Sequence, residues 1–87
     1  MLRALFVGGL VDNSELDMDG PRPPKHYPED TGAGTPRYRL RQLGLREDGE
    51  VVYAVYGARE MSDAFVEQVA DDRDYARRFE ARPQAAY

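Results

Sequence analysis

Three arginines at alternate positions, Arg37, Arg39 and Arg41, are the side chains of this sequence best suited to bind a charged group. A planar guanidinium donates paired hydrogen bonds to carboxylates and phosphates and also stacks on aromatic rings. Residues two apart on a strand share one face, and the expected hairpin register places Tyr56 on that same face. Arginine and tyrosine beside apolar residues are typical of protein-binding surfaces. We therefore predict that Arg37, Arg39, Arg41 and Tyr56 contact a partner.

Two other interpretations of this arginine stripe (Arg37, Arg39 and Arg41) stay open. The three side chains could form a solvated rim that pairs across the sheet with the acidic residues Glu15, Asp17 and Asp19. They could instead bind the phosphates of a nucleic acid. The formal net charge of −4 argues against indiscriminate binding of that kind, because phosphate affinity depends on a basic surface.

Catalysis would have to use His26, the only histidine of the chain. The hydroxyl groups available as nucleophiles are those of Ser14, Thr31, Thr35 and Ser62, and none lies in a recognisable nucleophile motif. Because a nucleophile, a base and an orienting group cannot all be identified, we predict that the protein is not an enzyme. A small enzyme that uses His26 is the remaining alternative.

No metal or cofactor site is predicted either. The segment from Glu15 through Asp17 to Asp19 resembles the start of a calcium loop, but such a loop requires aspartate first and glutamate twelfth, where this chain has Glu15 and His26. Gly8-Gly9 follows a predicted strand but lacks the other residues of a phosphate-binding loop. With no cysteine, thiolate zinc sites and disulfides are excluded.

The chain has 87 residues, which is the size of a single domain with a small core, so a homodimer or a tight partner is a reasonable expectation. The apolar run at the N-terminus is too short for a signal peptide, and no run approaches the length of a membrane span. We expect a cytoplasmic protein.

The arginine stripe requires a strand to position it, and residues 37–57 read as one β-hairpin with Asp48-Gly49 at its tip. Asp-Gly favours a two-residue type I′ turn. That turn would pair Arg46 with Val51, Leu45 with Val52 and Leu43 with Ala54. Both faces of this hairpin carry apolar residues, so both faces require cover.

We predict that residues 2–19 form a second hairpin. Leu2–Val7 is rich in residues that favour strands, Asp12-Asn13 is a turn signal, and the alternation after it turns Leu16 and Met18 inward. Residues 20–36 are rich in proline and glycine and form a long loop. The rings of His26 and Tyr27 could anchor that loop over an open face of the sheet.

We predict that residues 61–82 form a helix that begins after Ser62, which would be its N-cap. Its apolar stripe would comprise Phe65, Val69, Ala76 and Phe79, and a break near Asp71-Asp72 into two short helices is an alternative. Residues 83–87 would be a flexible tail after Pro83. The predicted fold class is α+β: a small antiparallel sheet of two hairpins with the C-terminal helix on one face. We expect that face to carry Tyr38, Leu40, Val51, Tyr53 and Val55.

The start Phe6-Val7-Gly8-Gly9, the Tyr38-Arg39 strand and the Val52-Tyr53 strand resemble small proteins of tailed phages and prophages. The chain departs from that pattern at Leu10, where proline is usual, and at Asn13, where glycine is usual. The resemblance implies no particular activity. It implies a phage setting, in which the partner would be a host protein that this chain modulates.

Overall fold

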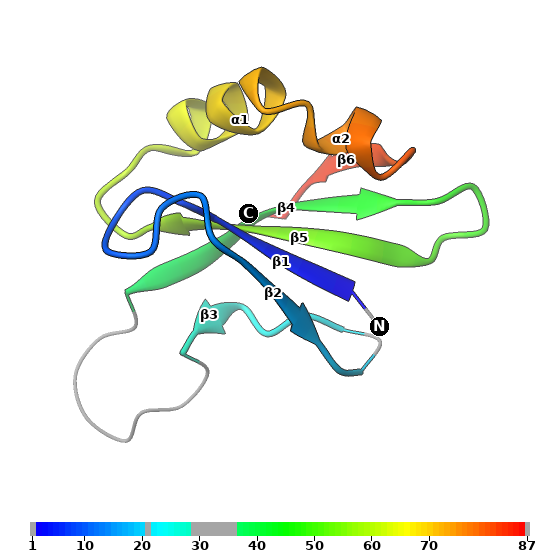
Figure 1. Ribbon diagram of the computed structural model, residues 1–87, viewed down its shortest axis with the longest axis horizontal. Coiled ribbons are helices and arrows are strands. Elements are labelled where there is room, and N and C mark those ends of the chain that lie inside the picture. Colours follow the sequence, from blue (N-terminus) through cyan, green and yellow to red (C-terminus); the bar gives the residue numbers. More distant parts are fainter. Residues whose placement is uncertain (1, 21, 29–36, 87) are drawn as a thin grey trace.

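One curled sheet of six strands organises the chain, and a short helix covers one of its faces (Figure 1). The computed structural model describes residues 2–20, 22–28 and 37–86. The strands run in the order β2-β1-β5-β4-β3, and β6 also pairs with β4. Their bounds are β1 Leu2–Val7, β2 Glu15–Met18, β3 His26–Tyr27, β4 Tyr38–Leu45, β5 Val51–Ala58 and β6 Arg82–Ala85.

Both predicted hairpins are present, but the sheet is mixed and not purely antiparallel. β1 pairs antiparallel with β2, and β4 pairs antiparallel with β5. The two hairpins join through a parallel pairing of β1 with β5, in which Ala4 lies opposite Ala54. These two central strands are packed on both faces, which explains their nearly continuous apolar sequences.

The turn of the central hairpin differs from the prediction. Arg46 and Glu50 close a loop of three residues. The N–H of Arg46 donates to the carbonyl of Glu50 at 2.9 Å, and the N–H of Gly49 donates to the carbonyl of Arg46 at 2.9 Å. Gly49 has a φ of 90°, whereas Asp48 is not among the described residues with positive φ. A type I′ turn needs positive φ at both central residues, so that prediction was wrong.

The register changes along β4. Leu43 lies opposite Ala54 as predicted, but Leu45 lies opposite Val51, and two irregularities interrupt the pairing, one between Leu40 and Gln42 and one between Gly44 and Leu45. An extra residue in one strand moves every side chain beyond it to the other face relative to its partners. Tyr56 therefore lies opposite Leu40 and not beside Arg41.

The two faces of the sheet carry two apolar clusters, and the register change decides which residues belong to each. The cluster under the helices comprises Leu5, Val7, Val52, Tyr53, Val55, Val66, Ala70 and Tyr75. The opposite cluster comprises Leu2, Ala4, Phe6, Tyr38, Leu40, Ala54, Tyr56 and Ala58, with Val51 packed against it. The predicted placement toward the helix is thus confirmed for Tyr53 and Val55 and wrong for Tyr38, Leu40 and Val51.

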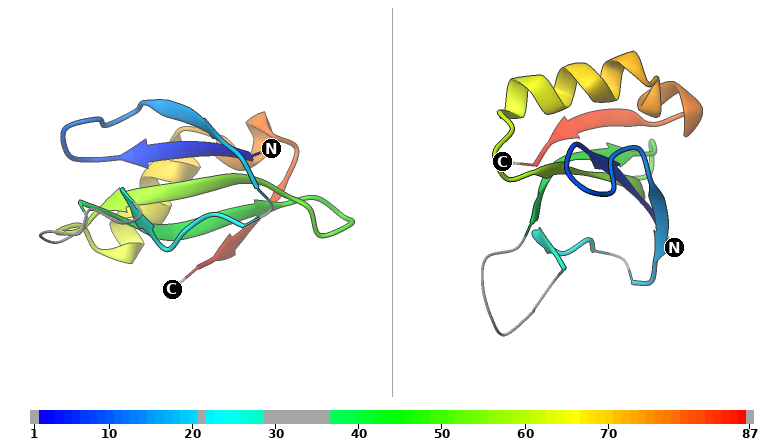
Figure 2. Two further views of the ribbon diagram at one scale, coloured as in Figure 1. Left: turned by 90° about the horizontal axis from the view of Figure 1, so that it is seen from below. Right: turned by 60° about the vertical axis from the view of Figure 1, so that its left-hand side comes forward.

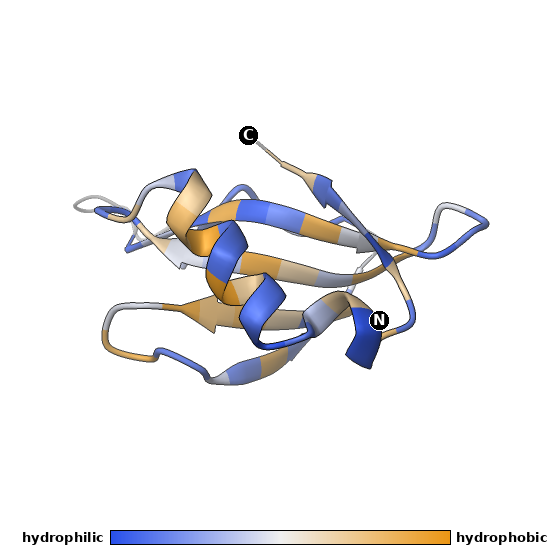
Figure 3. Ribbon diagram, turned by 90° about the horizontal axis from the view of Figure 1, so that it is seen from above, coloured by the Kyte–Doolittle hydropathy of each residue, from blue (hydrophilic) through white to orange (hydrophobic). Residues whose placement is uncertain are grey.

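Two short helices follow the sheet, as the alternative interpretation proposed. α1 spans Asp63–Asp72 and α2 spans Tyr75–Arg78. The Ser62 hydroxyl accepts from the N–H of Phe65 at 3.1 Å, which confirms it as the N-cap. The buried side of α1 carries Val66 and Ala70, while Phe65 of the predicted stripe is 51% exposed. The polar side of α1 faces away from the apolar strands (Figure 3).

Two short strands that were not predicted, β3 and β6, complete the outer edge of β4. The predicted helix end at Arg82 was wrong, because α2 ends at Arg78 and Arg82 begins β6. The tail predicted for residues 83–87 was wrong over 83–85, because β6 pairs there with the last residues of β4. The short strand β3 pairs with the beginning of β4. The ring of Tyr27 packs against Phe6 and Tyr56, so this part of the predicted loop covers the face opposite α1 (Figure 2). Residues 29–36 of that loop lie outside the described residues.

Candidate functional site

The four residues predicted to contact a partner do not lie on one surface. Arg41 is fully buried on the helix face, where it donates to Asp63 at 2.9 Å and to the carbonyl of Ala58 at 2.8 Å. Tyr56 is buried on the opposite face, and its hydroxyl donates to the carbonyl of Pro24 at 2.6 Å. Neither side chain can reach a partner in this conformation, because each is used to hold the fold together.

The other two arginines of the stripe are accessible to different degrees. Arg39 is partly exposed and donates to the same oxygen of Asp63, at 3.2 Å. Arg37 is exposed. The alternative of a solvated rim is wrong for Arg41, which is buried, and of the three arginines only Arg39 and Arg41 form ion pairs with a described residue, which is Asp63 on α1. The predicted partners Glu15 and Asp17 instead bind Arg3, at 3.0 and 2.7 Å.

Two of the four hydroxyl groups considered as nucleophiles have structural partners. Ser14 donates to the carbonyl of Val11 at 2.6 Å, and Ser62 caps a helix, so both hydroxyls have structural partners. Thr31 and Thr35 lie outside the described residues. Within the described ranges no group of three or more histidine, cysteine, aspartate or glutamate side chains could hold a metal ion. Among the residues that the structure describes, no helix is long and apolar enough to cross a membrane.

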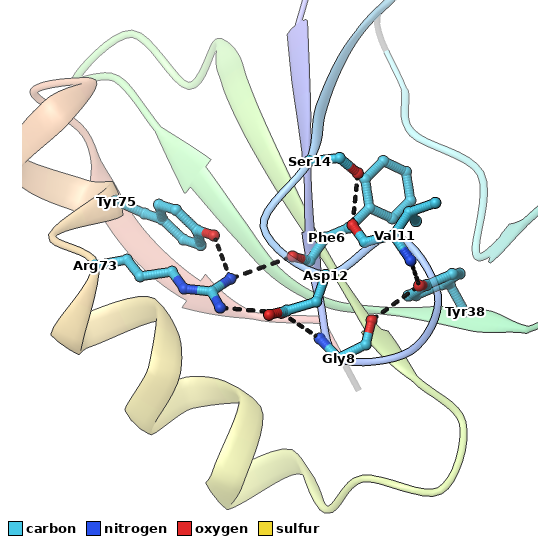
Figure 4. A network of polar contacts seen from close by, with 8 residues as sticks. All are labelled: Phe6, Gly8, Val11, Asp12, Ser14, Tyr38, Arg73 and Tyr75. Atoms are coloured by element: carbon cyan, nitrogen blue, oxygen red, sulfur yellow. Dashed lines mark hydrogen bonds and ion pairs between the residues drawn. The ribbon is translucent and has the colours of Figure 1, made fainter.

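A surface that the sequence analysis did not predict lies at the loop between β1 and β2, residues 8–14. Its backbone is held from inside the sheet by the buried side chain of Tyr38 (Figure 4). The Tyr38 hydroxyl donates to the carbonyl of Gly8 at 2.8 Å and accepts from the N–H of Val11 at 3.0 Å. One side chain from β4 thus fixes both arms of the loop.

A second clamp holds the same loop from the helical side (Figure 4). The carboxylate of Asp12 accepts from the N–H of Gly8 at 2.7 Å and from the Arg73 guanidinium at 2.9 Å. Arg73 also donates to the carbonyl of Phe6 at 3.2 Å and to the hydroxyl of Tyr75 at 3.1 Å. The hydrogen bond from Gly8, together with Arg73, holds the pKa of Asp12 below its usual value. The predicted turn at Asp12-Asn13 is confirmed, with Asn13 at a φ of 66°.

This loop, held by hydrogen bonds at both arms, presents apolar side chains to solvent. Leu10 is 81% exposed and Val11 is 44% exposed. Leu10 lines a pocket of about 350 Å³ together with Gly9, Arg37, Tyr38, Ala58, Arg59 and Glu60. Neither arginine has an ion pair with another described residue. We call Leu10, Val11, Arg37 and Arg59 the loop patch.

One signal for the loop patch was present in the sequence. Leu10 and Val11 are apolar residues inside a stretch of glycine, aspartate and asparagine that must turn. An apolar residue in a tight turn has few neighbours that could bury it. Arg59 could not be found in the same way, since its proximity to Leu10 depends on the parallel pairing of β1 with β5.

Comparisons of the chain with models of protein families, with curated proteins and with solved structures found no match. The resemblance to phage proteins therefore stays a prediction.

Proposed function

We propose that this chain is a non-enzymatic binding protein that docks on a partner protein through the loop patch. The observation that carries the proposal is Leu10, which is 81% exposed at the tip of a loop held by Tyr38, Asp12 and Arg73. In the phage setting that the sequence resemblance implies, the partner is a host protein that the chain modulates. The contact proposed from sequence keeps Arg37 and replaces Arg39, Arg41 and Tyr56 with Leu10, Val11 and Arg59.

The rigidity of the loop supports a binding role. An exposed leucine does not stabilise the fold of its own chain, because its apolar surface stays in water. Held in one conformation, however, it can enter a partner's pocket without the entropy cost of ordering a loop. The clamp by Tyr38, Asp12 and Arg73 provides that order before binding.

The charges around Leu10 indicate what kind of surface would receive it. Arg37 and Arg59 line the pocket and outnumber its single acidic residue, Glu60, and neither arginine forms an ion pair with another described residue. Arginine at the rim of an apolar contact binds carboxylates in a paired geometry. The expected partner surface is therefore an apolar pocket bordered by aspartate or glutamate.

The test compares affinity capture from host extract by the wild-type chain and by Leu10→Asp and Arg37→Glu variants. Both substitutions lie at exposed positions, so folding should change by less than about 0.5 kcal/mol. Captured proteins are identified by mass spectrometry, and the candidate is then purified for a direct measurement of Kd. Loss of a buried leucine contact should weaken binding by at least about tenfold.

Two matched variants control for nonspecific effects. Leu16→Asp changes a partly exposed leucine on β2, and Arg46→Glu changes an exposed arginine at the tip of the central hairpin. Both should bind like wild type. If Leu10→Asp and Arg37→Glu bind the purified partner as tightly as these controls do, the loop patch is not the contact surface.

A further inference from the structure

A second pocket, of about 450 Å³, lies on the outer edge of β4, where β3 and β6 approach each other. Its lining comprises Lys25, His26, Arg39, Leu40 and Ala86. The walls are fixed by backbone hydrogen bonds, because the N–H of Leu40 donates to the carbonyl of Lys25 at 2.8 Å and the N–H of Ala86 donates to the carbonyl of Arg41 at 3.0 Å.

The antiparallel pairing places two basic side chains side by side in this pocket. His26 lies directly opposite Arg39 in the register of β3 with β4. Opposite residues of an antiparallel pair project to the same face of the sheet, with their Cβ atoms about 5 Å apart. Lys25 precedes His26 and also lines the pocket. Arg39, which was predicted to bind a partner, and His26, which was considered only for the alternative of catalysis, thus line one pocket.

Positive charge exceeds negative charge at this edge of β4. Arg39 and the fully buried Arg41 both bond to a single oxygen of Asp63. Nε of Arg41 is buried and has no hydrogen-bond partner in the described part of the chain. Burial, followed by the nearby charge of Arg39, lowers the pKa of Arg41, against the opposing effects of Asp63 and Glu60. Lys25 adds a further cation that forms no ion pair with another described residue.

We infer that this pocket binds an oxyanion, either a carboxylate or a phosphate group, between Lys25, His26 and Arg39. The guanidinium of Arg39 has donors beyond the one that contacts Asp63, and the ammonium of Lys25 adds a mobile positive charge. A bound oxyanion would bring the number of negative charges closer to the number of positive ones. This site is separate from the loop patch and does not depend on it.

The single histidine makes the test direct, because His26 contributes the only imidazole signals in the proton NMR spectrum. Inorganic phosphate and, separately, succinate are titrated into the whole chain at fixed pH and fixed ionic strength. We expect a saturable shift of the His26 ring signals. Saturation by phosphate alone, by succinate alone or by both identifies which oxyanion the pocket accepts.

Two variants and two controls decide whether the shift reports this pocket. Arg39→Gln and Lys25→Gln should each weaken the response by about tenfold, since each removes a charge-assisted contact. Lys25 is exposed, so its variant stays informative even if Arg39→Gln disturbs the contact with Asp63. Arg46→Gln at the hairpin tip and Leu10→Asp in the loop patch should leave the response unchanged. A shift that does not saturate, or that Lys25→Gln leaves unaltered, would overturn the inference.

Discussion

The substitution Tyr38→Phe tests whether one hydroxyl holds the loop patch in place. The ring would keep its edge-on contact with Phe6, whose centroid lies 5.1 Å away, so only the oxygen is lost. Two backbone groups would then lose a partner, the carbonyl of Gly8 and the N–H of Val11. The bond to Gly8 is buried and the bond to Val11 is partly buried, so water can replace the second more easily than the first.

The burial of these two hydrogen bonds sets the loss of stability that we expect. Leaving a buried polar group without a partner costs about 1–3 kcal/mol, and a partly buried group that water can reach costs less. We therefore expect Tyr38→Phe to lower the free energy of unfolding by about 2 kcal/mol. For a domain of this size, that change lowers Tm by about 10 °C.

Two measurements check the prediction, urea unfolding followed by circular dichroism and hydrogen exchange of single amides. The Val11 amide should exchange faster in the variant by more than the loss of global stability explains. The Arg46 amide in the other turn, which donates to the carbonyl of Glu50, should follow global stability alone. An unfolding free energy within about 0.5 kcal/mol of wild type, the usual range for neutral surface changes, together with unchanged Val11 exchange, would refute the role assigned to the Tyr38 hydroxyl.

Two further substitutions test the clamp and the core. The pKa of Asp12 is lowered in the folded state, so its ionised form contributes stability above the unfolded pKa, and this contribution is lost as pH falls through the folded value. Asp12→Asn should therefore be less stable than wild type at pH 7. In urea unfolding at pH 7 and at a series of lower pH values, the difference should begin to shrink as the pH falls below about 4 and should close below the folded pKa. A difference that stays constant would contradict the assignment. A methyl group at Gly44 would overlap the buried ring of Tyr53, so Gly44→Ala should cost about 1–3 kcal/mol in thermal unfolding. That cost should shrink when Tyr53 is also replaced by leucine, and equal costs in the two backgrounds would show that the ring is not the obstacle.

The elements that depend on near neighbours could be predicted from the sequence. Strand-favouring residues marked β1, alternation marked β2, and Asp48-Gly49 marked the position of the central turn, although not its type. Asp12-Asn13 marked a turn that the structure contains. Ser62 is the N-cap that its type and position predicted. A break near Asp71-Asp72 was the alternative to one helix, and the structure has two short helices, of which the first ends at Asp72. Each of these signals acts over about four residues, which is the range that sequence patterns report directly.

The candidate sites depended on contacts between distant parts of the chain. An irregularity near Arg41 separated it from Tyr56, although strict alternation had placed both on one face. Nothing in the alternation of β4 marks that irregularity, because an extra residue is seen only against the partner strand. The parallel pairing of β1 with β5 and the return of β6 to β4 are likewise chosen by which apolar faces can be buried together.

The sequence by itself therefore determined the two hairpins, the helix start and the presence of arginines able to bind an anion or a carboxylate. Tertiary structure alone decided what each arginine does. Arg41 is buried as a structural cation, Arg39 joins His26 in a pocket, and Arg37 flanks Leu10. The physical reason is that guanidinium chemistry is a property of the residue, whereas its exposure and its counter-charge are set by strands that meet only in the folded chain.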